Sequence, residues 1–157
     1  MKRHPSITVL SREHHGALIL ARLLQKGSPP YKNLPKDLAG KAAYATNAYL
    51  TELSDHFLAE EISLLEQVSG IDSGMDKLIK EIYAEHKELR LLFETIAVSD
   101  HLETHLNLLG YALEKHIRKE ERILFPLIQD TCNEALLGHI QQLLSEKQPH
   151  EGHRKQQ

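Results

Sequence analysis

Apolar residues recur at steps of three and four along most of this 157-residue chain, which is the period of a helix packed along one side. The first such stretch is expected to begin at Ser11, a good helix-capping residue, and to end at Gly27. The second covers residues 36–69, up to Gly70. The pattern therefore predicts two long helices, joined by a proline-rich connection over residues 28–35.

Capping boxes predict where the remaining helices begin. Ser73 with Asp76 opens a third helix, and Asp100 with Glu103 opens a fourth, which Pro126 should kink or end. A short fifth helix follows from Thr131 and Glu134. The expected inner faces are Ala45, Tyr49, Leu53, His56, Glu60 and Leu64 on the second helix, Ile79, Ile82, His86, Leu89, Phe93 and Ile96 on the third, and His105, Leu109, Ala112, His116, Glu120 and Ile123 on the fourth.

No stretch alternates apolar and polar residues over the length of a strand, and short connections favour antiparallel neighbours. The expected fold is all-α: an antiparallel up-down-up-down four-helix bundle with a short C-terminal fifth helix. Residues 1–147 would form this single domain, and the polar tail over residues 148–157 is expected to be disordered.

Composition narrows the classes of function. A formal net charge of -3 with no separate block of Lys and Arg argues against nucleic-acid binding. Charges interrupt every leucine-rich segment, so no membrane span is expected, and the N-terminus has too short an apolar run for a signal peptide. We expect a cytoplasmic protein. The anomaly is histidine, with 11 residues beside a single cysteine.

Two of the histidines belong to a repeated motif. His56 and Glu60 are four residues apart, as are His116 and Glu120, so each pair projects from one face of a helix. An imidazole and a carboxylate side by side form half of a metal site. The second copy of the motif predicts a centre with two metal ions.

The other two long helices each carry a histidine on the predicted inner face, His14 and His86. Imidazole and carboxylate ligands without thiolates suit iron and, less well, manganese or zinc. If each metal takes about six ligands, then four histidines, two bridging glutamates and a bridging oxide or hydroxide leave about two positions open. A redox-active metal with an open position can bind a small diatomic molecule or a peroxide.

Several alternatives remain within this set. A single His–Glu pair is commonly a solvated contact on a helix, but two carboxylates buried among leucines without a metal would be costly. His15 adjoins His14, although its helical stripe includes a charged residue. Two further glutamates, Glu61 and Glu121, could replace the bridges, yet supporting or surface contacts are favoured for them. Packing is favoured over pocket-lining roles for Tyr49 and His105.

The motifs H-F-L-A-E-E and H-I-R-K-E-E-R-I-L-F-P, with S-R-E-H-H and A-E-H-K-E-L, resemble the hemerythrin-like family, also called the HHE cation-binding domain, over about residues 8–130. The resemblance implies a four-helix bundle around a non-haem di-iron centre. It also implies as metal ligands His14, His56, Glu60, His86, His116 and Glu120.

The chain departs from the oxygen-carrying members of this family. Those place a second histidine one turn from the first on the third helix, where this chain has Ile82 and Arg90 around His86. The set of four histidines and two glutamates is closer to di-iron proteins linked to nitrosative stress and iron-centre repair. The leading hypothesis is a protein that binds O2, NO or a related small oxidant for sensing, scavenging or stress response. A di-iron oxidoreductase that reduces nitric oxide or peroxide, and an iron-handling or repair protein, are the alternatives.

Overall fold

The computed structural model describes residues 2–155, with side chains up to residue 146. The first bundle helix is α1 (Pro5–Leu23) and the third is α5 (Ser73–Glu94). The second runs without a break through α2 (Leu38–Ala48), η1 (Tyr49–Leu53), α3 (Ser54–Ala59), η2 (Glu60–Leu65) and α4 (Glu66–Val68). The fourth consists of α6 (Leu102–Lys119), η4 (Glu120–Leu124) and α7 (Phe125–Thr131), and the short 3-10 turn η3 (Ile96–Val98) precedes it.

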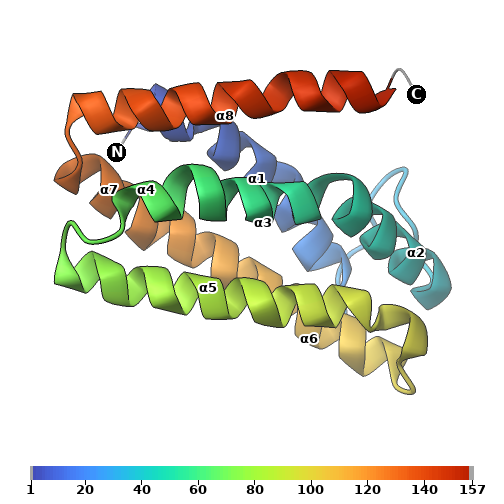
Figure 1. Ribbon diagram of the computed structural model, residues 1–157. Coiled ribbons are helices and arrows are strands. Elements are labelled where there is room, and N and C mark those ends of the chain that lie inside the picture. Colours follow the sequence, from blue (N-terminus) through green and yellow to red (C-terminus); the bar gives the residue numbers. More distant parts are fainter. Residues whose placement is uncertain (1, 156–157) are drawn as a thin grey trace.

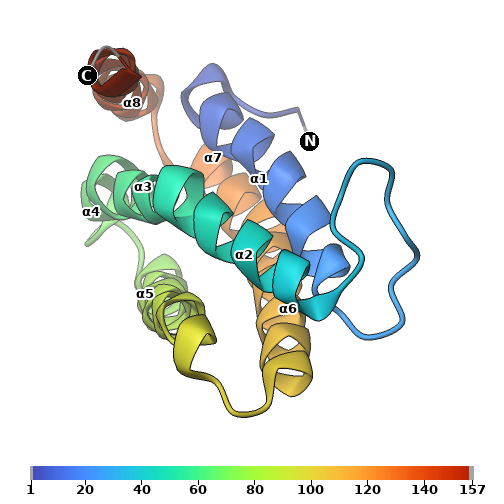
Figure 2. The same cartoon turned by 90° about the vertical axis from the view of Figure 1, so that its right-hand side faces the viewer.

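The four bundle helices alternate in direction, as predicted (Figure 1). Seen along the bundle, they enclose one common interior, and the C-terminal helix α8 (Glu134–Lys155) lies outside them (Figure 2). Helix α8 packs against α1 and η2, where Leu137, Ile140 and Leu144 are buried. It continues as helix beyond residue 148, where the sequence predicts a disordered tail. Because the side chains of residues 147–157 lie outside the described part, that boundary stays a prediction.

Two apolar clusters fill the interior, one toward each end of the bundle. One joins α8 to α1, η2, α4, α5 and α7 and includes Ile82 and Phe125. The other joins α1 to η1, α3, α5 and α6 and includes Phe57 and Leu113. Between these clusters lie buried polar side chains. The core therefore encloses a polar layer in mid-bundle.

Helix starts differ from several of the predicted positions. Helix α1 begins at Pro5, well before the predicted Ser11, because the ring of His4 accepts a hydrogen bond from the backbone N–H of Ser6 and caps it. Asp72 rather than Ser73 caps α5, by accepting from the N–H of Met75. His101 precedes α6 without a side-chain cap. The stop predicted at Gly70 was correct, since α4 ends at Val68, but α1 ends at Leu23, four residues before Gly27. Both glycines have positive φ angles, 75° at Gly27 and 82° at Gly70, which suit glycine.

The sequence predicts that Pro126 kinks or ends the fourth helix, but the helix does not end there and continues to Thr131. The π-helical segment η4 comes directly before α7, which contains Pro126. Proline has no backbone N–H to donate, and the wider turn lies where that hydrogen bond is missing. The extra residue in this turn also rotates the positions after it around the helix. Ile123, predicted to face inward, is therefore 54% exposed, and Leu124 is buried in its place.

Candidate metal centre

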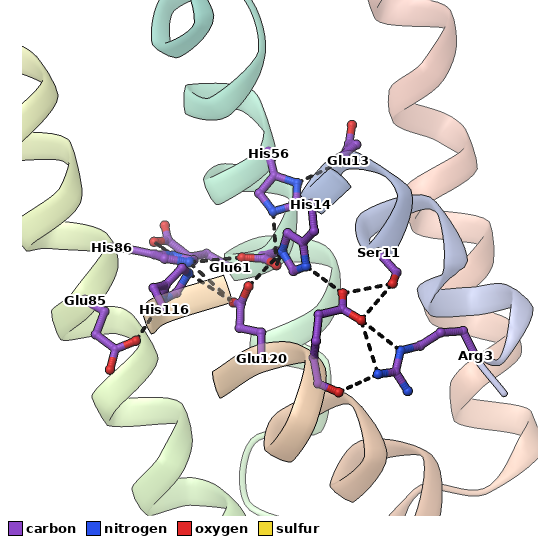
Figure 3. A network of polar contacts seen from close by, with 12 residues as sticks. Arg3, Ser11, Glu13, His14, His56, Glu61, Glu85, His86, His116 and Glu120 are labelled. Carbon is purple, nitrogen blue, oxygen red and sulfur yellow. Dashed lines mark hydrogen bonds and ion pairs between the residues drawn. The ribbon is translucent and has the colours of Figure 1, made fainter. Parts of the chain in front are cut away.

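Four histidines and two glutamates meet in the polar layer between the two apolar clusters (Figure 3). His14 comes from α1, His56 from α3, His86 from α5 and His116 from α6. The two glutamates occupy the first positions of η2 and η4. All six side chains are at most 4% exposed: His14, His56, Glu60, His86, His116 and Glu120.

The six residues form two groups that share both carboxylates. One group is His14, His56, Glu60 and Glu120, and the other is Glu60, His86, His116 and Glu120; within each, the candidate ligand atoms lie within 4.8 Å of one another. Oε2 of Glu60 lies 3.4 Å and 3.2 Å from the Nε2 atoms of His14 and His56, while its Oε1 lies 3.0 Å from Nε2 of His86. Each glutamate thus offers one oxygen to each group.

Glu120 has the complementary arrangement. Its Oε1 lies 2.9 Å from Nε2 of His14, and its Oε2 lies 3.4 Å from Nε2 of His116. Two ligands at right angles, each about 2.1 Å from a metal ion, would be about 3 Å apart. The spacing of these atoms therefore matches that of neighbouring ligands around two cations.

The inward atoms of all six side chains have no hydrogen-bond partner among the described residues. These are Nε2 of each histidine and both carboxylate oxygens of Glu60 and Glu120. Buried polar atoms are normally paired, and leaving a charged group unpaired is costly. A pair of metal ions would satisfy all eight atoms, so the residues present fit a two-metal centre.

A second set of glutamates orients the histidines, and we call these four the outer carboxylates. Each accepts from the Nδ1 atom of one histidine: Glu121 from His14 at 2.6 Å, Glu13 from His56 at 2.8 Å, Glu61 from His86 at 2.7 Å and Glu85 from His116 at 2.7 Å. A proton fixed on Nδ1 leaves the Nε2 lone pair free to bind a metal. Every imidazole is thus held in the tautomer that a metal site needs.

The outer carboxylates form a closed ring around the bundle. Glu13 of the first bundle helix binds His56 of the second, and Glu61 of the second binds His86 of the third. In the same sense, the third helix supplies Glu85 to the fourth, and the fourth supplies Glu121 to the first. Each helix therefore carries a histidine and also orients the histidine of its neighbour.

The wide π-helical turns explain how Glu61 and Glu121 reach these histidines. On an ideal helix, a residue five positions after His56 or His116 points well away from the interior. Both residues instead lie in η2 and η4, where the extra residue per turn lets two successive glutamates serve one site. The supporting contacts favoured for them from the sequence are present.

Sequence reasoning missed Glu13 and Glu85 altogether. Each directly precedes a candidate ligand, His14 or His86, but orients a histidine on a different helix. The dipeptide Glu-His, which occurs at both places, was the available signal. His15, the rejected alternative to His14, is exposed. Tyr49 and His105 pack as expected, with Tyr49 donating to Glu94 and His105 bonded to the carbonyl oxygen of Leu92.

The cluster is strongly negative. Six carboxylates converge here, and three cations accompany them: Arg3 on Glu121, Arg90 on Glu61 and Lys119 on Glu85. With neutral histidines, about three negative charges remain uncompensated. Such a cluster attracts cations.

Without a metal, protons bound to the histidines would balance part of this negative charge. Burial opposes the charged form of the histidines, but the surrounding carboxylates outweigh it and raise the pKa of His56 to about 9 and that of His86 to about 11. They also hold the pKa of His14 well above its usual value. Burial acts to raise the pKa of Glu60, but the nearby histidines dominate and lower it well below its ordinary range. The same negative charge would attract metal cations, which must displace these protons to bind the Nε2 atoms.

No helix in the described part of the chain is long and apolar enough to cross a membrane. No curated protein and no solved structure matches the chain. The hemerythrin HHE cation-binding domain matches residues 6–128, with a second match over residues 77–152. Its first match covers nearly all of the four bundle helices and includes all six candidate ligands. The chain therefore belongs to the hemerythrin HHE cation-binding domain family.

Proposed function

We propose that this protein holds two iron ions at the candidate centre and binds O2, NO or a related small oxidant there, for sensing, scavenging or stress response. The observation that carries the proposal is the set of eight unpartnered buried atoms, divided into two groups that share two carboxylates. His14 and His56 would hold one ion, and His86 and His116 the other. Glu60 and Glu120 would bridge both ions.

The choice of metal rests on the donor atoms. Imidazole nitrogens and carboxylate oxygens without thiolates suit iron, whereas magnesium and calcium prefer oxygen ligands alone. Bound iron supplies redox chemistry and open coordination positions for a small ligand. With two histidines and two bridging oxygens each, neither ion would be fully coordinated by the chain.

The residues around the centre cover two of the histidines and fix the donor atoms. Phe57 lies against His86, with ring centroids 4.7 Å apart, and Phe125 stacks on His14 at 5.5 Å. The outer carboxylates hold each Nδ1 proton, so the histidines are preorganised as neutral ligands. This enclosure favours a small neutral ligand over a bulky organic substrate.

The first experiment is to measure metal content per chain after expression in iron-replete medium, with absorption spectra before and after exposure to air and to NO. We expect about two irons per chain and a near-ultraviolet band that changes with either gas. Glu60→Gln should lower the iron content, while Glu88→Gln, an exposed glutamate on α5, should leave it unchanged. Zinc alone, or no stoichiometric metal, would overturn the proposal.

A further inference from the structure

Each hydrogen bond between an outer carboxylate and its histidine is one arm of the ring. The four arms differ in how firmly other contacts hold the carboxylate. Three outer carboxylates each bind a cation as well as a histidine, and Glu121 also accepts from the hydroxyl of Ser11. Among the described residues, the side chain of Glu13 has no Lys or Arg within ion-pair distance, and its one hydrogen bond is to His56. Its side chain is 43% exposed, against 14% to 24% for Glu61, Glu85 and Glu121. The arm that orients His56 is therefore the least restrained.

A cavity of about 360 Å³ opens beside this arm, between α1 and the second bundle helix. Glu13 and His56 border it together with Glu52, and small residues widen it, among them Gly16, Ala17 and Ala48. A Cβ atom added at Gly16 would meet no atom within 4 Å. The cavity thus extends from solvent to the ring of a candidate ligand.

We propose that this cavity is the route by which metal ions enter and leave the centre, with His56 as the ligand that moves. The inference rests on the proposed function, since it concerns loading of the same centre. Glu52 and Glu13 provide carboxylates at the cavity, which suits a divalent cation rather than an anion. The ring of His56 lies between the cavity and the centre, with Nδ1 bonded to Glu13 and the unpartnered Nε2 atom 3.2 Å from Glu60, so this ring must move to let a cation pass.

Movement of His56 requires the loss of one hydrogen bond, to an exposed partner. The other three histidines are bonded to carboxylates that a cation restrains: Glu61 is held by both terminal nitrogens of Arg90, at 2.8 and 3.0 Å. Displacing His86, His116 or His14 would disturb such a pair as well. Exchange through the His56 arm therefore breaks the fewest contacts.

Filling the cavity tests this route without touching a ligand. Gly16→Leu adds a side chain at the cavity wall where a Cβ meets nothing, so the fold should tolerate it. We expect release of Fe(II) to a chelator, and uptake of Fe(II) by the metal-free protein, to slow by about tenfold, with unchanged final iron content. The matched control is Gly138→Leu on α8, another helical glycine with open space around its Cβ, which should exchange at the wild-type rate.

A second variant tests the charge at the cavity rather than its shape. Glu52→Gln should slow Fe(II) uptake several-fold at low ionic strength, and the difference should shrink as salt is added. Glu88→Gln, on a different helix, should not slow uptake. Wild-type exchange rates in both Gly16→Leu and Glu52→Gln would overturn the route while leaving the di-iron proposal intact. A wild-type chain that takes up no stoichiometric iron would instead remove the proposed function.

Discussion

Each inward-facing histidine depends on a glutamate that belongs to another helix. The bond from Nδ1 to that carboxylate selects the tautomer and fixes the ring plane, so we expect the outer carboxylate to raise metal affinity without touching the metal. Burial acts to raise the pKa of Glu85, but His116 and Lys119 dominate and lower it. It therefore carries its charge at neutral pH.

Glu85→Gln is expected to weaken metal binding by about 10- to 100-fold, because the neutral amide is a poorer acceptor for His116 and leaves Lys119 paired with Glu81 alone. Competition against a chelator of known affinity measures the effect. Glu88→Gln, one turn along the same helix and exposed, is the control. Equal affinities in the two variants would mean that the outer carboxylate has no part in metal binding.

Raising the pH should destabilise the metal-free protein. The folded pKa of His56 is raised to about 9. A raised folded pKa contributes stability that is complete below the unfolded value near 6.5 and is lost as the pH rises through the folded value. The Tm of chelator-treated protein should therefore fall by several degrees between pH 6.5 and 9.

Metal binding should have the opposite pH dependence and weaken as the pH falls. Metal-bound imidazoles must be unprotonated, so metal binding at neutral pH should displace protons from His14, His56 and His86 and tighten as the pH rises. Iron retained through an acid titration would contradict histidine ligation.

For the metal-free protein, a Tm that stays level from pH 6.5 to 9 would contradict the raised pKa values.

Helices α1 and α6 pack closely against each other at a glycine, Gly110. A Cβ atom at Gly110 would lie 2.5 Å from the carbonyl oxygen of Ala21 and 3.1 Å from the Cβ of Leu24. Backbone atoms cannot yield as a side chain can. The contact sets how near the first and fourth bundle helices lie, and hence how near His14 lies to Glu120.

Gly110→Ala should therefore destabilise the protein by about 1–3 kcal/mol, as overpacking does in a close-packed core. The opposite sign is expected at Gly138, where an added Cβ meets nothing and alanine is the better helix former by about 0.5–1 kcal/mol. Denaturant unfolding of both variants measures the difference. A Gly110→Ala protein as stable as the wild type would show that the two helices can separate freely.

The periodicity of the sequence was sufficient to predict the bundle and most of its inner surface. The faces predicted for the second and third helices, from Ala45 to Leu64 and from Ile79 to Ile96, are all buried. The prediction for Ile123 was wrong because ideal helical spacing does not anticipate a π-helical turn. The outer ring could not be predicted for a different reason: the partner of Glu13 or Glu85 is on another helix, and only packing decides which one.

At the scale of the whole molecule, the four-helix bundle consists of two helix pairs that carry the same types of candidate ligand in the same order. Glu13 and His14 correspond to Glu85 and His86, and the motif H-x-x-x-E-E occurs once in each pair. Each pair contributes two histidines and one shared glutamate. Neither pair alone can complete either four-residue group, because both groups use Glu60 and Glu120.

Removing metal should consequently destabilise the entire fold. Ligand binding to the folded state adds about 2.7 kcal/mol when free ligand is about 100 times its Kd, which corresponds to roughly 5–10 °C in Tm for a chain of this size. Calorimetry before and after chelation, at pH 7, measures the shift, and reloading with Fe(II) should reverse it. Glu60→Gln should show a smaller shift. A Tm indifferent to chelator would assign the histidines a purely structural role.

The closed order of the outer carboxylates has a mechanical consequence. No helix can slide along the bundle axis without moving its own histidine away from one neighbour and its own glutamate away from the other. A displacement of one helical turn, about 5.4 Å, would break two arms at once. These hydrogen bonds therefore fix the position of each of the four bundle helices along the bundle axis. The loops at the ends of the bundle are not alone in aligning the helices.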